Sequence, residues 1–177
     1  MEADRTTNVL VVDDEAALLE SYAAMLSARY EVATATSGTA ALETLDEETD
    51  VVLLDRRMPE QSGAEILSEI RSRQECQVVF CSAVVPGTEI IPLDLDDYLQ
   101  KPVGPDELVD VIETQAELAT ESEGVREYAA LEAKRTALET AEMGTTLEDD
   151  EQYQQLLDRI ERKEKRLDTA TIDVSPA

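Results

Sequence analysis

Short apolar runs alternate with segments of helical apolar spacing through the first 120 residues of this chain. The runs have the length and composition of buried strands, and they lie at residues 8–12, 30–34, 50–54, 77–81 and 97–100. Between them, apolar side chains recur at intervals of three and four residues, in segments near residues 14–28, 37–45, 63–73 and 105–120. This alternation predicts an α/β domain with a five-stranded parallel sheet and helices on both of its faces.

One stretch, residues 84–96, breaks the alternation. A helix is expected between the fourth and fifth strands, but this stretch contains Pro86, Gly87 and Pro92. Proline removes a backbone donor and ends helices, so one or two turns are the most that fit between these residues. We therefore predict a short or irregular element here.

Polar side chains follow the apolar strands at the point where each strand ends. Asp13 and Asp14 follow the first strand, and Asp55 follows the third. In such sheets ligands bind at the carboxyl ends of the strands, so we expect these three carboxylates to lie close together. Clustered carboxylates call for a cation, and oxygen ligands without His or thiolate indicate Mg²⁺. An Asp in that setting can act as a nucleophile and become an aspartyl phosphate.

Donors for a phosphoryl group follow the last two strands. Ser82 supplies a hydroxyl after the fourth strand, and the backbone amide of Ala83 adds a second donor. Lys101 follows the fifth strand and supplies an ammonium that would neutralise the transferring group. Pro102 comes next, and a cis bond between the two would aim the lysine side chain.

These residues together resemble the receiver domain of two-component response regulators. The resemblance covers residues 8–120 and depends on four motifs in order, namely Asp13-Asp14-Glu15, Leu53-Leu54-Asp55-Arg56-Arg57-Met58-Pro59 with Gly63, Ser82-Ala83, and Asp97-Tyr98-Leu99-Gln100-Lys101-Pro102. It implies a flavodoxin-like five-stranded parallel sheet in the order 2-1-3-4-5. It also implies a phosphoacceptor rather than an enzyme with its own substrate, catalytic only in its own phosphorylation and dephosphorylation.

The resemblance also implies a role for each site residue. Asp55 accepts a phosphoryl group from a sensor histidine kinase. Asp14, Asp55 and the backbone carbonyl of Arg57 bind Mg²⁺ directly, while Asp13 acts largely through water. Lys101, Ser82 and the Ala83 amide bind the phosphoryl group. Ser82 moves toward the phosphate and Tyr98 turns inward, which makes these two residues the switch.

The last third of the chain has a different pattern. Residues 121–124 indicate a joint, two helical stretches cover about 125–142 and 148–168, and residues 143–146 form a turn between them. We predict a receiver domain at residues 1–122 and an antiparallel helical hairpin or coiled coil at residues 123–177 with a disordered tail. This part resembles the HalX-type region that follows receivers in haloarchaeal regulators. Removing residues 124–177 is expected to leave a folded receiver.

Two classes of output remain open. In the first, the hairpin relays the signal by dimerisation or by docking a partner protein. In the second, it is a DNA-binding transcriptional effector, which a cluster of cations late in the second helix favours: Arg159, Arg162, Lys163, Lys165 and Arg166. Cations near a helix C-terminus also suit the helix dipole and pair with interleaved acids, and this structural explanation is the stronger one.

The charge balance bears on the environment of the protein. Asp and Glu number 41 against 15 Lys and Arg, which gives a net charge of −26. Such a charge disfavours a compact fold in dilute salt but is screened in molar salt, so the composition resembles that of haloarchaeal proteins. Disorder conflicts with the periodic apolar segments. The apolar runs are too short to span a bilayer, which predicts a cytoplasmic protein without a membrane partner, and Cys76 and Cys81 are expected to be free thiols.

Overall fold

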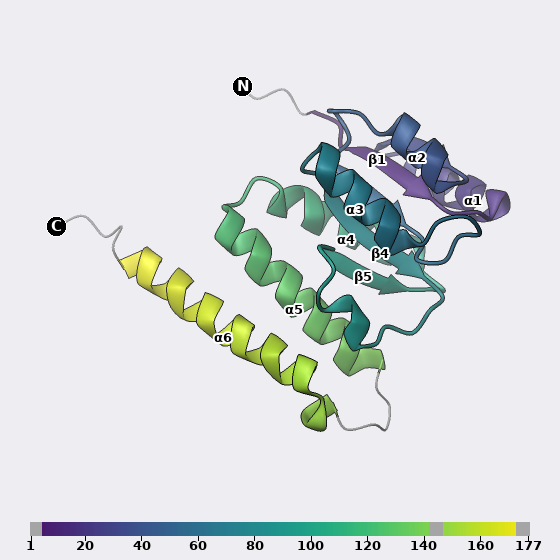
Figure 1. Ribbon diagram of the computed structural model, residues 1–177. Coiled ribbons are helices and arrows are strands. Elements are labelled where there is room, and N and C mark those ends of the chain that lie inside the picture. Colours follow the sequence, from purple (N-terminus) through teal and green to yellow (C-terminus); the bar gives the residue numbers. More distant parts are fainter. Residues whose placement is uncertain (1–4, 142–146, 173–177) are drawn as a thin grey trace.

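The computed structural model describes residues 5–141 and 147–172 of the chain (Figure 1). The turn predicted at residues 143–146 falls in the interval that is not described. The predicted disordered tail likewise extends over residues 173–177, which lie outside the described residues.

Five parallel strands form one sheet in the order β2-β1-β3-β4-β5, which confirms the predicted flavodoxin-like topology. The strands are β1 (Asn8–Val12), β2 (Glu31–Ala35), β3 (Val51–Leu54), β4 (Gln77–Ser82) and β5 (Asp97–Gln100). Every residue of β3 and β4 is buried, as expected for central strands covered on both faces. The register pairs Val12 with Leu54, so the residues that follow these two strands emerge side by side.

Four helices belong to the alternating part of the chain: α1 (Ala16–Leu26), α2 (Gly38–Thr44), α3 (Gly63–Arg73) and α4 (Pro105–Leu118). Local signals explain where they begin. Ser37 accepts a hydrogen bond from the amide of Ala40, Ser62 and Glu65 form a capping box, and Pro105 occupies the first turn of α4.

Two layers of helices cover the sheet, and each layer has its own apolar core. On one face, α1 and α4 pack against alternate residues of the central strands, with Leu26, Leu108 and Ile112 at the centre. The other face carries α2 and α3, and Ile66 and Ile70 of α3 are fully buried. This second layer stops short of β5, because a third helix is lacking between β4 and β5.

The segment between β4 and β5 contains only η1 (Thr88–Ile90), a single 3₁₀ turn, as the prolines predicted. The uncovered flank of the sheet is covered instead by α5 (Glu123–Ala141), against which α6 (Glu151–Ile172) packs after η2 (Leu147–Asp149). Figure 1 shows α5 running beside β5, with α6 antiparallel on its outer side. The hairpin therefore takes the place of the missing crossover helix.

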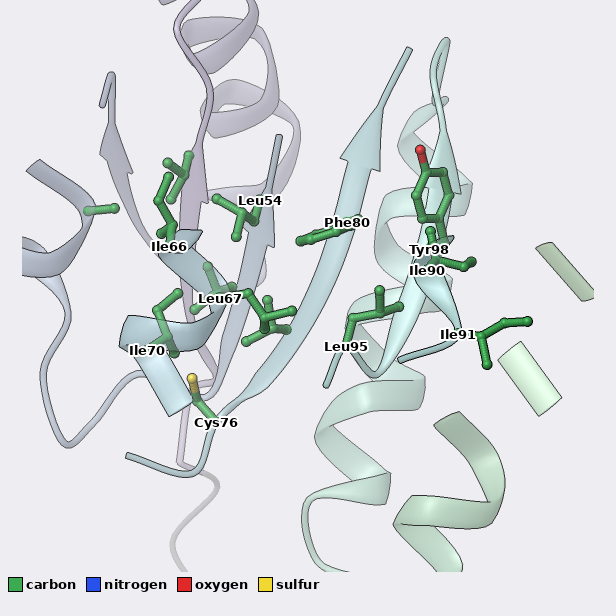
Figure 2. Packing of buried hydrophobic residues seen from close by; sticks show 14 of the residues in the cluster. Leu54, Ile66, Leu67, Ile70, Cys76, Phe80, Ile90, Ile91, Leu95 and Tyr98 are labelled. Atoms are coloured by element: carbon green, nitrogen blue, oxygen red, sulfur yellow. The ribbon is translucent and has the colours of Figure 1, made fainter. Parts of the chain in front are cut away.

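The packing of the hairpin is continuous with the receiver core. The apolar cluster that contains Phe80 and Tyr98 also contains five buried hairpin residues, namely Leu131, Leu138, Tyr153, Leu156 and Ile160. Figure 2 shows this cluster from the α3 residues at one end, across Phe80, to Ile90, Leu95 and Tyr98 beside β5. One core thus spans both parts of the chain, which argues against the expectation that the receiver stays folded without the hairpin.

Lys134 of α5 lies inside this junction. Its side chain is 5% exposed, and its Nζ donates hydrogen bonds to the carbonyls of Ile91 at 3.2 Å and Leu93 at 2.6 Å. Burial, together with repulsion from Arg159, lowers the pKa of Lys134 to about 8. The lysine thus provides hydrogen-bond donors for the irregular segment that replaces the crossover helix. None of the described helices is long and apolar enough to cross a membrane.

Candidate functional site

Three carboxylates meet at the carboxyl end of the sheet. One oxygen from each of Asp13, Asp14 and Asp55 lies within 4.8 Å of the other two. Asp13 and Asp55 are 2% and 8% exposed, whereas Asp14 is exposed. The parallel register of β1 and β3 produces this meeting, because Asp13 and Asp55 directly follow the paired residues Val12 and Leu54. An all-oxygen set of this kind fits a hard divalent cation such as Mg²⁺.

Lys101 reaches the same cluster from β5. Its Nζ forms an ion pair with Asp13 and lies 3.9 Å from Oδ2 of Asp55. The backbone amide of Lys101 donates to the carbonyl of Ser82 at 2.9 Å, and the bond between Lys101 and Pro102 is cis, as the sequence suggested. The structure therefore brings the predicted ammonium to the predicted carboxylates.

The electrostatics of the cluster are set by burial and by these charges. Burial raises the pKa of Asp55, and the ammonium of Lys101 opposes this rise. Burial alone would lower the pKa of Lys101, but the carboxylates of Asp13 and Asp55 outweigh it and leave the pKa above its usual value. The lysine is thus held in its charged form beside the aspartates.

Ser82 ends β4 next to the cluster. Its side chain is 1% exposed, and its hydroxyl accepts a hydrogen bond from the amide of Val84 at 3.3 Å. Ala83 follows at the exposed end of the strand. Arg57 lies on the loop between Asp55 and α3, which we call the acceptor loop. Its amide donates to Oδ1 of Asp55 at 3.3 Å. The predicted metal-binding and phosphate-binding residues thus lie at or beside this end of the sheet.

Tyr98 connects the site with the hairpin side of the sheet. Its ring is 7% exposed and packs edge-on against Phe80, with ring centroids 6.2 Å apart. Its hydroxyl donates to the carbonyl of Val84, two residues beyond Ser82. A cavity of about 300 Å³ lies between Tyr98 and α5, where Ala133 and Ala137 line it.

The acceptor loop makes one close approach that explains a glycine. A Cβ at Gly63 would lie 2.8 Å from both the Cα of Arg56 and the carbonyl oxygen of Asp55, so only glycine lets α3 begin here. The amide of Gly63 also donates to the carbonyl of Arg56 at 2.9 Å. These two contacts hold the loop after the acceptor against the start of α3.

Comparison with known proteins agrees with this geometry. The model of the response regulator receiver domain matches residues 9–113, and that of the HalX domain matches residues 117–175. The chain belongs to the response regulator receiver family. Receiver domains are regulatory phosphoacceptors rather than classical enzymes, and they bind Mg²⁺ through acidic residues.

Relatives of this receiver come from archaea and bacteria. A Haloferax volcanii protein provisionally named a transcriptional regulator is 41% identical over 155 residues, covering 86% of this chain and 26% of the relative. The transcriptional regulatory protein KdpE of Mycobacterium tuberculosis is 38% identical over 108 residues, covering 58% of this chain and 48% of KdpE. The chain therefore spans about a quarter to a half of these relatives.

The fold has a close counterpart among solved structures. The CheY-like receiver domain protein of Methanospirillum hungatei is 25% identical with a TM-score of 0.59, covering 64% of this chain and 95% of that chain. The matched share corresponds to the receiver alone. The haloarchaeal relative fits the environment inferred from the acid excess.

Proposed function

We propose that this protein is a two-component response regulator in which Asp55 accepts a phosphoryl group from a sensor histidine kinase. Receivers of this family are phosphorylated by such kinases. The observation that supports the assignment to Asp55 is the convergence of three carboxylates and the Lys101 ammonium in one cluster, with Asp55 beside the lysine. Mg²⁺ is proposed to bind Asp14, Asp55 and the Arg57 carbonyl directly, and Asp13 largely through water.

The chemistry assigned to these residues is a simple transfer. An Oδ of Asp55 forms a bond to phosphorus while the bond from phosphorus to the kinase imidazole nitrogen breaks, and the imidazole keeps the electron pair. Mg²⁺, when bound, neutralises charge on the carboxylates and the phosphoryl oxygens. Lys101 donates to the phosphoryl group, Asp13 holds the lysine in place, and Ser82 with the Ala83 amide binds another phosphoryl oxygen.

The output is proposed to pass through the hairpin, because Tyr98 of the switch belongs to the same apolar cluster as Leu131 and Leu138. Phosphorylation adds about two negative charges at Asp55, and Ser82 moves toward them. Tyr98 then turns inward into the space that Ser82 vacates, which changes its packing against α5 beside the adjoining cavity. The repacked hairpin docks a partner protein or forms a homodimer.

The first test is substitution of the acceptor. Asp55→Asn should abolish phosphate incorporation from acetyl phosphate in molar KCl, and Asp46→Asn, at an exposed position before the start of β3, serves as the matched control. Asp14→Ala should remove the Mg²⁺ dependence of incorporation. Labelling of Asp55→Asn at the wild-type level would refute the assignment. Light scattering with and without beryllofluoride, a phosphoryl mimic, then shows whether activation changes assembly.

A DNA-binding output is the second candidate, supported by the names of the relatives and by the cations of α6. Four of these cations line a groove of about 620 Å³ between the hairpin and the receiver, namely Arg159, Arg162, Lys163 and Arg166. Acids share that groove, and Lys163 pairs with Glu127 of α5. This arrangement favours an internal role for the cations. Titration of duplex binding against salt decides, because a slope near zero or no binding removes this candidate.

A further inference from the structure

Arg56, the residue after the acceptor, has contacts that the transfer chemistry does not use. Its Nη2 donates to Oε1 of Glu89 in η1 at 2.7 Å, and its side chain is only 19% exposed. Its guanidinium also contacts the side chain of Tyr98, whereas its buried Nη1 makes no well-aligned hydrogen bond among the described residues. A guanidinium is costly to bury, and the many exposed acids of this chain offer it cheaper partners. Its position therefore calls for an explanation.

Glu89 lies in the short turn that stands where a crossover helix is expected. Thr88, its neighbour in η1, donates from Oγ1 to Oδ2 of Asp150 at 3.4 Å. Asp150 in turn caps the start of α6, because its Oδ1 accepts from the amides of Gln152 at 2.8 Å and Tyr153 at 3.1 Å. A continuous series of polar contacts thus leads from the acceptor loop through η1 to the first turn of α6.

The same turn is anchored in the shared core. Ile90 of η1 is fully buried, and it belongs to one apolar cluster with Tyr153 and Leu156 of α6. A displacement of η1 therefore changes the packing at the start of α6 as well as the polar contacts. A three-residue turn held by a few side-chain contacts can take two discrete positions more readily than a full helix.

We propose that Arg56 is a positioning residue that couples the acceptor site to the hairpin through its ion pair with Glu89. This inference rests on the proposed phosphorylation of Asp55. A phosphoryl group next to Arg56 in the chain competes with Glu89 for the guanidinium and repels the Glu89 carboxylate. Because Glu89 is 55% exposed, the pair is weak enough for that competition to break it. Release of Glu89 frees η1 and loosens the cap of α6.

The test compares hydrogen exchange of the full chain in molar KCl with and without beryllofluoride. In the wild type, beryllofluoride should speed hydrogen exchange in the first turns of α6, near residues 151–157, by about fivefold. Arg56→Gln and Glu89→Gln should each lose most of this response while phosphate incorporation from acetyl phosphate stays within about twofold of the wild type. The double variant should lose no more of the α6 response than either single variant loses.

Controls separate coupling from stability. Arg56→Lys keeps the charge and should retain most of the α6 response. Arg29→Gln removes an exposed ion pair between the turn that follows α1 and Glu113 of α4 on the opposite face, and it should leave the response intact. An α6 response that persists in both Arg56→Gln and Glu89→Gln overturns the inference. So does a wild type in which beryllofluoride protects the residues around Asp55 but leaves α6 unchanged.

The same experiment distinguishes failure of the proposed function. A wild type that shows no beryllofluoride effect around Asp55 and no phosphate incorporation contradicts the acceptor assignment itself, and the coupling falls with it. Both are supported if the wild type incorporates phosphate and responds in α6 and if Arg56→Gln loses the α6 response.

Discussion

The carboxylate site and the flank of β5 are formed in different ways. At the carboxyl ends of β1 and β3, the site is made by residues that directly follow strands, so neighbouring backbone positions bring Asp13 and Asp55 together. At the flank of β5, the surface is completed by helices more than twenty residues farther along the chain. The first arrangement follows from the parallel register of the strands, whereas the second depends on η1 standing in place of a crossover helix and on α5 covering the flank.

This difference bears on whether the hairpin can be removed without unfolding the receiver. A hairpin joined to a complete receiver would keep its own core and could be removed. Here α5 supplies Leu131 and Leu138 to the core of the sheet, while α6 supplies Ile160. The receiver and the hairpin therefore share one apolar core.

Deletion of residues 124–177 tests most directly whether the receiver depends on the hairpin. Removing the hairpin exposes Ile90, Ile91, Leu95 and Tyr98, which costs about 6–12 kcal/mol at roughly 1.5–3 kcal/mol for each side chain. That loss is comparable to the whole stability of a domain, about 5–15 kcal/mol. The truncated chain should therefore be largely unfolded in molar KCl by circular dichroism.

Adding residues 124–177 as a separate peptide should restore the fold of the truncated chain. A truncated chain that unfolds cooperatively at the wild-type temperature would show that the receiver is independent after all.

A single substitution in the shared core tests the same dependence. Leu138→Ala in α5 should lower the free energy of unfolding by about 2–5 kcal/mol, because Leu138 is fully buried. Ile70→Ala in α3, at the far end of the same cluster, is the matched control and should cost a similar amount. Denaturant titration should show one transition in each variant. A separate, earlier transition of the hairpin in Leu138→Ala would mean that the two regions fold apart.

Lys134 adds a pH dependence that belongs to the junction alone. Its folded pKa is about 8 against an ordinary value of 10.5, so between these values the unfolded chain binds more protons. Stability should therefore rise with pH across this window, by about 3 kcal/mol from this group. Asp94, Asp96, Arg71 and Arg159 are the charged groups that face it.

Cysteine and tyrosine also titrate in that window, so the measurement is the difference between the wild type and Lys134→Met. In chemical denaturation, the free energy of unfolding of the wild type should rise relative to that of Lys134→Met from pH 8 to pH 10.5. Parallel curves for the two proteins would mean that Lys134 is solvated.

The smallest effect is expected at the edge of the hairpin. Glu127→Gln removes the ion pair with Lys163, whose two side chains are 49% and 27% exposed. The cost should be about 0.2–1 kcal/mol in dilute salt and less in molar KCl, where screening is strong. Thermal unfolding at two KCl concentrations measures it. A larger loss that persists in molar salt would indicate that this pair is buried in the junction.

The parts of this structure that sequence could predict are the local ones. Asp55 and Lys101 are chemically distinctive residues at strand ends, so their meeting follows from the parallel topology. The prolines of residues 84–96 likewise predicted the loss of the crossover helix. Their consequence was not predicted, because the apolar spacing of Leu131 and Leu138 shows that α5 has a buried face but not which surface covers it.

Two polar residues escaped sequence reasoning for a similar reason. A lysine within a charged helix is normally solvated, and nothing in the pattern around Lys134 marks it as buried. Arg56 is an arginine beside another arginine, and its partner Glu89 lies 33 residues away in an irregular segment. The missing crossover helix is the only signal that could have drawn attention to both, since each contacts the segment that replaces it.

The replacement of a central helix by a terminal one also sets an order of events during synthesis. Tyr98 and Ile90 leave the ribosome roughly 60 residues before Ile160, a delay of about 3–12 s at 5–20 residues per second. Until α5 and then α6 have been made, the cover of the β5 flank is incomplete, and its apolar side chains are open to other nascent chains or chaperones. The same α5 and α6 that are proposed to carry the signal in the finished protein thus also end its most aggregation-prone stage.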